Sequence, residues 1–133
     1  MSHEIARSLL DRITALAASE PHEVCGLLLG EAGRIDAIMP AANVAPDPAR
    51  HFELDPAMLI AAHRRARANG PAVIGHYHSH PSGVAEPSAT DLACAAPDGS
   101  LWLIVAGSDV GLWTALPDAN GRVHFVPATL CVL

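Results

Sequence analysis

Apolar residues recur every three or four positions at the start of the chain: Ile5, Leu9, Ile13 and Leu16. This spacing predicts an N-terminal helix, capped by Ser2 and ended by Glu20-Pro21. A second helix is predicted to begin at Asp55-Pro56, because proline suits the first helical position, and to end at Gly70. A short third helix is predicted to begin at Ser88.

Short apolar runs between turn residues predict the strands. Residues 24–30 are apolar apart from their glycines, which is typical of a strand buried on both faces. The other predicted strands cover residues 35–39, 52–54, 73–80, 101–106, 111–116 and 122–126. Residues 40–50 and 81–87 are rich in proline or glycine and predict loops. The order mixes helices with hairpins, so we expect one α/β or α+β domain over residues 1–133, built on a mixed sheet.

Charge and composition exclude several classes of protein. The chain has 133 residues and a formal net charge of −6, which disfavours nucleic acid as a partner. No apolar run approaches the roughly 20 residues that cross a bilayer, and the N-terminus does not resemble a signal peptide. We therefore expect a cytoplasmic protein with no membrane partner. Three widely spaced cysteines disfavour a disulfide framework, and Cys25 is expected to be buried.

Two histidines and an aspartate form a candidate zinc site. His78 and His80 lie two apart on a predicted strand, so both imidazoles can point to one side. A catalytic zinc takes three protein ligands and keeps one position open, and Asp91 can supply the third ligand. Residues 88–91 also match a helix capping box, with Ser88 at the N-cap. Taken alone, that segment is more typical of a cap than of a ligand.

The full pattern resembles that of a known family. His78-Ser-His80-Pro81, six residues, Ser88, two residues and Asp91 match the H-x-H-P-x6-S-x2-D pattern of JAMM (MPN-type) zinc metalloproteases. Upstream, Glu23 stands just ahead of a Cys-Gly pair and an apolar strand, like the family's other element. The resemblance covers nearly the whole chain and is closest to small bacterial members. It implies a fold similar to that of cytidine deaminases, with helices on both sides of the mixed sheet.

The resemblance also implies a role for each matching residue. His78, His80 and Asp91 would bind one Zn²⁺ per chain. Glu23 would hold the zinc-bound water, take its proton and pass it to the leaving amine. Ser88 would donate a hydrogen bond to the oxyanion that forms at the attacked carbonyl.

The resemblance further implies the class of substrate. JAMM enzymes cleave peptide or isopeptide bonds, typically after the C-terminal Gly-Gly of ubiquitin-like proteins. Small bacterial members resemble enzymes that trim sulfur-carrier proteins, so a ubiquitin-like or sulfur-carrier protein is the expected partner. Peptide, isopeptide and cysteine-adduct bonds stay open, as do the oligomeric state and the roles of Cys25 and His76. For His76, a core or surface position is favoured over one beside the metal.

Two alternatives belong to other functional classes. The first is a non-catalytic MPN-type binding module, which the complete set of Glu23, His78, His80 and Asp91 disfavours. The second is a RadC-like, DNA-associated domain, whose pattern Ser82-Gly83 and Pro87 also fit. RadC-like chains are longer, with an N-terminal helical part, and the acidity of this chain disfavours DNA.

Overall fold

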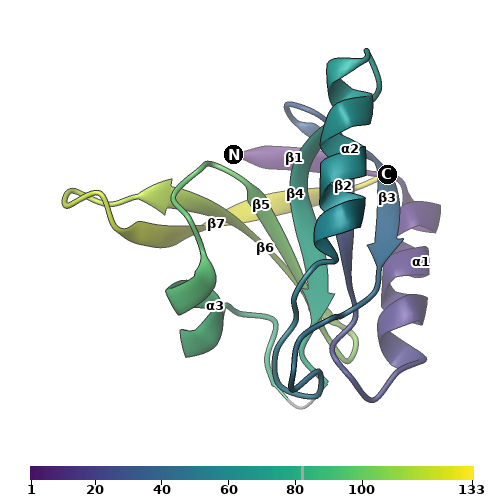
Figure 1. Ribbon diagram of the computed structural model, residues 1–133, viewed down its shortest axis with the longest axis vertical. Coiled ribbons are helices and arrows are strands. Elements are labelled where there is room, and N and C mark those ends of the chain that lie inside the picture. The colour runs from purple at the N-terminus through teal and green to yellow at the C-terminus, as the bar shows by residue number, and fades with distance from the viewer. Residues whose placement is uncertain (82) are drawn as a thin grey trace.

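The computed structural model describes residues 1–81 and 83–133, and within them the chain forms three helices and seven strands (Figure 1). Ser82, which the RadC-like pattern includes, lies outside the described residues. The elements in chain order are β1 (Ser2–Ile5), α1 (Arg7–Ala18), β2 (Cys25–Glu31), β3 (Arg34–Ala41), α2 (Pro56–Arg67), β4 (Ala72–Ser79), α3 (Ala89–Cys94), β5 (Leu101–Ala106), β6 (Asp109–Pro117) and β7 (Val123–Val132).

The strands form one mixed sheet that closes on itself. They pair in the order β1-β3-β2-β4-β5-β6-β7, and β1 closes the barrel because it pairs with both β3 and β7. Both pairings of β1 are parallel, as is that of β4 with β5, whereas the other pairs are antiparallel. The predicted mixed sheet is confirmed, but its closure was not predicted. The likeness to cytidine deaminases stays a prediction.

The N-terminal strand β1 corrects the predicted start of the first helix. Ser2 does not cap a helix, because α1 begins only at Arg7, after Ala6. Within Ser2–Ile5, buried and exposed side chains alternate, and His3 and Ile5 point inward. This alternation is that of a strand, and pairing with two distant strands decides the conformation.

Two further predictions differ from the structure. Residues 52–54 form no named strand; Leu54 makes only an isolated bridge to Asn43. The last strand does not stop at residue 126 but continues through Pro127 to Val132, because its second half pairs with β1. The other predicted strands and helices are confirmed within a few residues of their predicted ends.

Helices cover both faces of the central strands. Leu28 of β2 packs with Ile13 of α1 in one apolar cluster, whereas Leu27 and Leu29 pack with Ala62 of α2 in another. Neighbouring side chains of a strand point to opposite faces, so β2 is buried on both sides, as predicted. Figure 1 shows α2 lying along β4 and α3 below the sheet on the side of β7. Among the described residues, no helix is long and apolar enough to cross a membrane.

Candidate metal centre

The two histidines of the candidate site lie at the end of β4. His78 pairs with Cys25 of β2 on one side and Ile104 of β5 on the other, and its side chain is fully buried. His80 follows the strand, where its backbone N–H donates to the carbonyl oxygen of Val105 at 2.8 Å. Their two side chains therefore share one face, as the alternation along a strand predicts.

Three ligand atoms meet at this point. The Nε2 atoms of His78 and His80 lie 3.1 Å apart, and Asp91 Oδ2 lies 3.3 Å from the first and 3.1 Å from the second. A tetrahedral zinc ion with ligands at about 2.0–2.1 Å places each pair of ligand atoms about 3.3 Å apart. The triangle has that size, so these three side chains fit a zinc ion.

Asp91 also belongs to a complete capping box at the start of α3. The Ser88 N–H donates to Asp91 Oδ2 at 2.9 Å, and the Asp91 N–H donates to Ser88 Oγ at 3.0 Å. The cap is therefore present, and the same carboxylate oxygen faces both imidazoles. Cap and ligand are compatible descriptions of one side chain.

Burial and hydrogen bonds together shift the pKa values of the three side chains in the triangle. Burial opposes ionisation of Asp91, but hydrogen bonds with His78 and His80 outweigh it and lower the pKa of the carboxyl. Burial lowers the pKa of His78, so its imidazole is neutral. Burial also opposes the charge on His80, but its bonds to Asp91 and to the Val84 carbonyl raise its pKa. An anionic oxygen beside two imidazoles suits a divalent cation.

Glu23 faces the two histidines from the segment before β2. Its side chain is buried, and its carboxylate lies within 4.8 Å of the ligand nitrogens of His78 and His80. Burial raises the pKa of Glu23, His80 opposes the rise and the charge of Asp91 adds to it, so that together they bring the pKa to about 7. A carboxylate with a pKa near neutrality is suited to proton transfer in both directions.

The backbone around Glu23 is tied to neighbouring segments. The Glu23 N–H donates to the Pro48 carbonyl at 2.8 Å, and its own carbonyl accepts from Asn43 Nδ2 at 2.8 Å. The next residue, Val24, exchanges two hydrogen bonds with Ser79, which lies between the two histidines in sequence. These contacts hold the glutamate in register with the end of β4.

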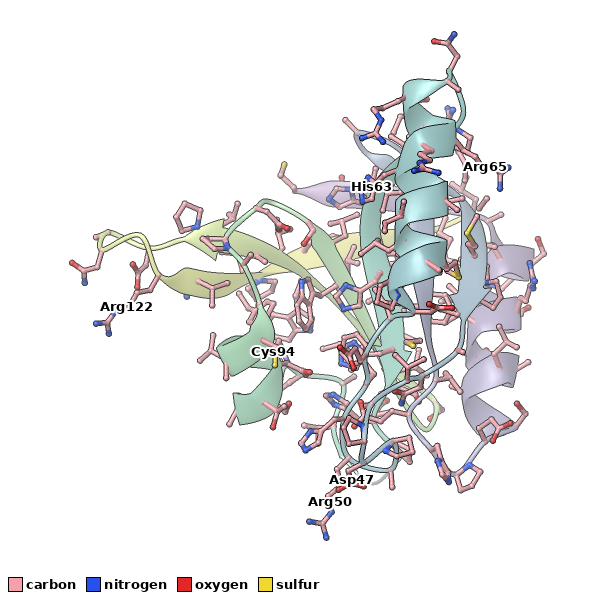
Figure 2. The ribbon with its side chains drawn as sticks, viewed as in Figure 1. Asp47, Arg50, His63, Arg65, Cys94 and Arg122 are labelled. Atoms are coloured by element: carbon pink, nitrogen blue, oxygen red, sulfur yellow. The ribbon has the colours of Figure 1, made fainter. Side chains whose placement is uncertain are left out.

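A hollow of about 220 Å³ opens beside the triangle. It is bordered by Glu23, Ala49, Arg50, His80, Pro81, Gly83 and Ser88. Ser88 is exposed to this hollow, and its Oγ accepts from the Asp91 N–H, so the hydroxyl hydrogen is free to donate. Figure 2 shows the Arg50 side chain at the lower edge of the molecule beside Asp47, and Arg50 Nε lies 3.9 Å from Asp47 Oδ2. All five residues singled out from the sequence therefore lie around one position.

Four residues near the site were not recognised from the sequence: Asn43, Phe52, Ser79 and Val84. Asn43 lies in a predicted loop and Phe52 in a predicted strand, within a segment that resembles small bacterial family members, but the sequence assigned neither a role. A serine between two histidines on a buried strand was a signal, because a buried hydroxyl needs a partner. His76 is buried among aromatic rings, so it takes the core position of the two, core or surface, that were expected for it. Cys25 is buried too, and all three cysteines are free.

Comparison with curated proteins finds relatives in archaea and bacteria. The chain is 39% identical over 90 residues to a desampylase of Haloferax volcanii, and the aligned region covers 66% of this chain and 65% of that protein. It is 34% identical over 89 residues to a probable TtuB-protein conjugate cleaving protease of Thermus thermophilus, and the aligned region covers 66% of this chain and 60% of that protein. The matches thus span somewhat less than two thirds of these relatives' lengths.

A solved structure and a protein family agree with these relatives. The crystal structure of AF2198, a JAB1/MPN domain protein from Archaeoglobus fulgidus, superposes with a TM-score of 0.60 at 23% identity, covering 99% of this chain and 98% of that one. This likeness shows the fold. Residues 6–117 match Prok-JAB, described as prokaryotic homologs of the JAB domain. The resemblance to the JAMM (MPN-type) family is confirmed, and the chain belongs to the Prok-JAB family.

Proposed function

We propose that the chain is a zinc-dependent peptidase or isopeptidase that cleaves after the C-terminal Gly-Gly of a ubiquitin-like or sulfur-carrier protein. The observation that carries this proposal is the triangle of His78, His80 and Asp91 ligand atoms, with Glu23 and Ser88 around the adjoining hollow. The relatives support the substrate class, because one is named for cleaving protein conjugates and others are desampylases. A cytoplasmic location stays a prediction.

His78, His80 and Asp91 would hold the ion. When bound, zinc supplies a Lewis acid that lowers the pKa of water and polarises a carbonyl group. His80 is prepared for this role, since its Nδ1–H donates to the Val84 carbonyl at 2.8 Å and leaves the lone pair of Nε2 directed at the triangle.

The other two residues perform the proton transfer and bind the developing charge. Glu23 accepts a proton from the attacking water and later delivers it to the leaving amine, so that hydrolysis adds OH to the carbonyl carbon and H to the nitrogen. Burial raises the pKa of Glu23 in the metal-free protein, which favours its uptake of a proton. Ser88 donates its free hydroxyl hydrogen to the oxygen of the attacked carbonyl, a contact worth roughly 3 kcal/mol in such sites.

Zinc content and cleavage together test the proposal. The wild type is expected to contain about one zinc per chain and to release a Gly-Gly-extended ubiquitin-like carrier from a fusion partner. Asp91→Ala is expected to lose both metal and activity, whereas Asp11→Ala, an exposed aspartate on α1, keeps both. Glu23→Gln is expected to keep the metal and lose activity.

Two results would redirect the interpretation. A wild type that binds no zinc even when zinc is supplied favours the non-catalytic binding module. A zinc-loaded wild type that leaves every Gly-Gly-extended carrier intact removes the proposed substrate class but keeps the metal site.

A further inference from the structure

The second nitrogen of each ligand histidine has a different environment. Metal-bound histidines usually donate their other ring N–H to an oxygen, which fixes the direction of the ring. His80 does so, through Nδ1 to the Val84 carbonyl at 2.8 Å. His78 does not: its Nδ1 is buried and has no hydrogen-bond partner within the described part of the chain. Its Nε2 faces Asp91 and His80, where the metal would bind, so no hydrogen bond from the described residues helps to orient this ring on its Nδ1 side.

An aromatic ring lies against the face of the His78 imidazole. Phe52 stacks on the His78 imidazole with 4.2 Å between ring centroids and 18° between ring planes. The centroid of the same phenyl ring lies 5.0 Å from that of His76. Trp102 completes the cluster, with 4.3 Å between its ring centroid and that of His76 and 70° between the two ring planes. Rotation of the His78 ring about χ2 would drive it into Phe52, so the stack restricts the direction of Nε2.

The loop that carries Phe52 is itself fixed by one side chain. Asn43 Nδ2 donates to the carbonyl of His51 at 2.9 Å, and Asn43 Oδ1 accepts from the N–H of Glu53 at 3.1 Å. The residues on both sides of Phe52 are therefore bonded to a single amide group. The same Nδ2 donates to the Glu23 carbonyl at 2.8 Å. One asparagine thus sets the position of Phe52 relative to the glutamate of the site.

We propose that Phe52 is a positioning residue for the metal ligand His78, and that its stacked ring takes the place of the hydrogen bond that His78 Nδ1 lacks. The inference rests on the metal site of the proposed function. It adds Phe52, held by Asn43 and outside the H-x-H-P-x6-S-x2-D pattern, to the groups that determine zinc affinity.

The chain offers a matched control for this role. Its only two phenylalanines are both half-buried and both contact Trp102 edge-on, Phe52 at 6.2 Å and Phe125 at 4.9 Å. Phe52 reaches His78, whereas Phe125 meets the cluster through Trp102. Replacing either ring by leucine removes a comparable aromatic contact from the cluster, but only one change removes the stack on the ligand.

Zinc affinity measured by chelator competition tests the inference. Phe52→Leu is expected to weaken zinc binding about ten- to a hundredfold, the usual effect of losing support for a ligand histidine. Phe52→Tyr keeps the ring and Phe125→Leu keeps the stack, so both are expected to remain within about threefold of the wild type. The visible absorption of the cobalt-substituted protein should change in Phe52→Leu alone, because it reports ligand geometry independently of activity.

Several outcomes would overturn the inference. Wild-type affinity and spectrum in Phe52→Leu would show that the stack does not orient His78. Equal losses in Phe52→Leu and Phe125→Leu, or no recovery in Phe52→Tyr, would assign the effect to general loosening of the cluster. Phe52→Met replaces Phe52→Leu if thermal melting shows that the leucine variant does not fold. A wild type without zinc would instead defeat the proposed function itself.

Discussion

Glu23 should destabilise the metal-free fold at neutral and alkaline pH, and its replacement by glutamine should reverse this. Burial raises the pKa of its carboxyl from an ordinary value of 4.5 to about 7. A group whose pKa is higher in the folded protein than in the unfolded chain favours folding at low pH and opposes it as pH rises through the folded pKa. The wild type should therefore lose stability between about pH 4.5 and 7 through this one side chain.

The size of the effect follows from the two pKa values. At about 1.36 kcal/mol for each pH unit, the difference between 4.5 and about 7 corresponds to about 3 kcal/mol at pH 8. At pH 5 the penalty is below about 1 kcal/mol, because the folded carboxyl is still protonated. Glutamine has a similar shape and no charge, so Glu23→Gln should exceed the wild type in free energy of unfolding by these amounts.

Denaturant unfolding of chelator-treated wild type and Glu23→Gln at pH 5, 6.5 and 8 measures this difference directly. Glu20→Gln, an exposed glutamate in the same segment, is the control and should change stability by less than about 0.5 kcal/mol at every pH. A gap between Glu23→Gln and the wild type that is the same at pH 5 and pH 8 would refute the reasoning. Because whole domains are stable by only about 5–15 kcal/mol, the predicted gain would mark Glu23 as a residue kept for chemistry at the expense of stability.

Three further predictions concern neighbouring residues. Ser88→Ala should lower kcat about a hundredfold with zinc retained, and lower stability by about 1 kcal/mol through loss of the cap; steady-state kinetics and melting measure both. Zinc affinity should fall as pH falls through the raised pKa of His80, because a ligand imidazole must be neutral. A zinc affinity that does not change between pH 5.5 and 8 would contradict this. Asn43→Ala should lower the free energy of unfolding by about 3 kcal/mol, since it leaves several backbone groups unpaired. Denaturant unfolding measures this loss, with Asn120→Ala as the control variant.

The parts of the fold that the sequence predicted are those with local or unambiguous patterns. Residues 24–30 are apolar on both faces, and β2 is indeed buried between two helices. The proline after Asp55 marked the start of α2, where the aspartate side chain accepts from the Ala57 N–H. β1 was missed because Ile5 fits a helical spacing as well as a strand, and its partners β3 and β7 are distant in sequence. Pairing over such separations is decided by tertiary contacts, which no local window contains.

The candidate site also contains residues that local sequence rules predict and residues that only the tertiary fold places. His78 and His80 could be paired from the alternation of side chains along a strand, which is a local rule. Phe52 and Asn43 could not be assigned, since each reaches the site from a long loop whose path no periodicity describes. Figure 1 shows this loop, between β3 and α2, running beside the end of β4. The residues that contact the candidate ligands from this loop therefore could not be predicted from the sequence, because their positions depend on where the irregular backbone is held by tertiary contacts.

Asp91 shows how a structural role and a proposed chemical role can coincide. From the sequence, residues 88–91 supported either a capping box or a ligand, and the cap had the greater weight when the segment stood alone. The structure contains the cap, and its two hydrogen bonds fix the same carboxylate that meets His78 and His80. A cap costs little to keep, because it stabilises the start of α3, and it also restricts the aspartate to the orientation that a metal would require. The presence of a cap is therefore no argument against a ligand at N3, and the third corner of the triangle is held in place by the helix itself.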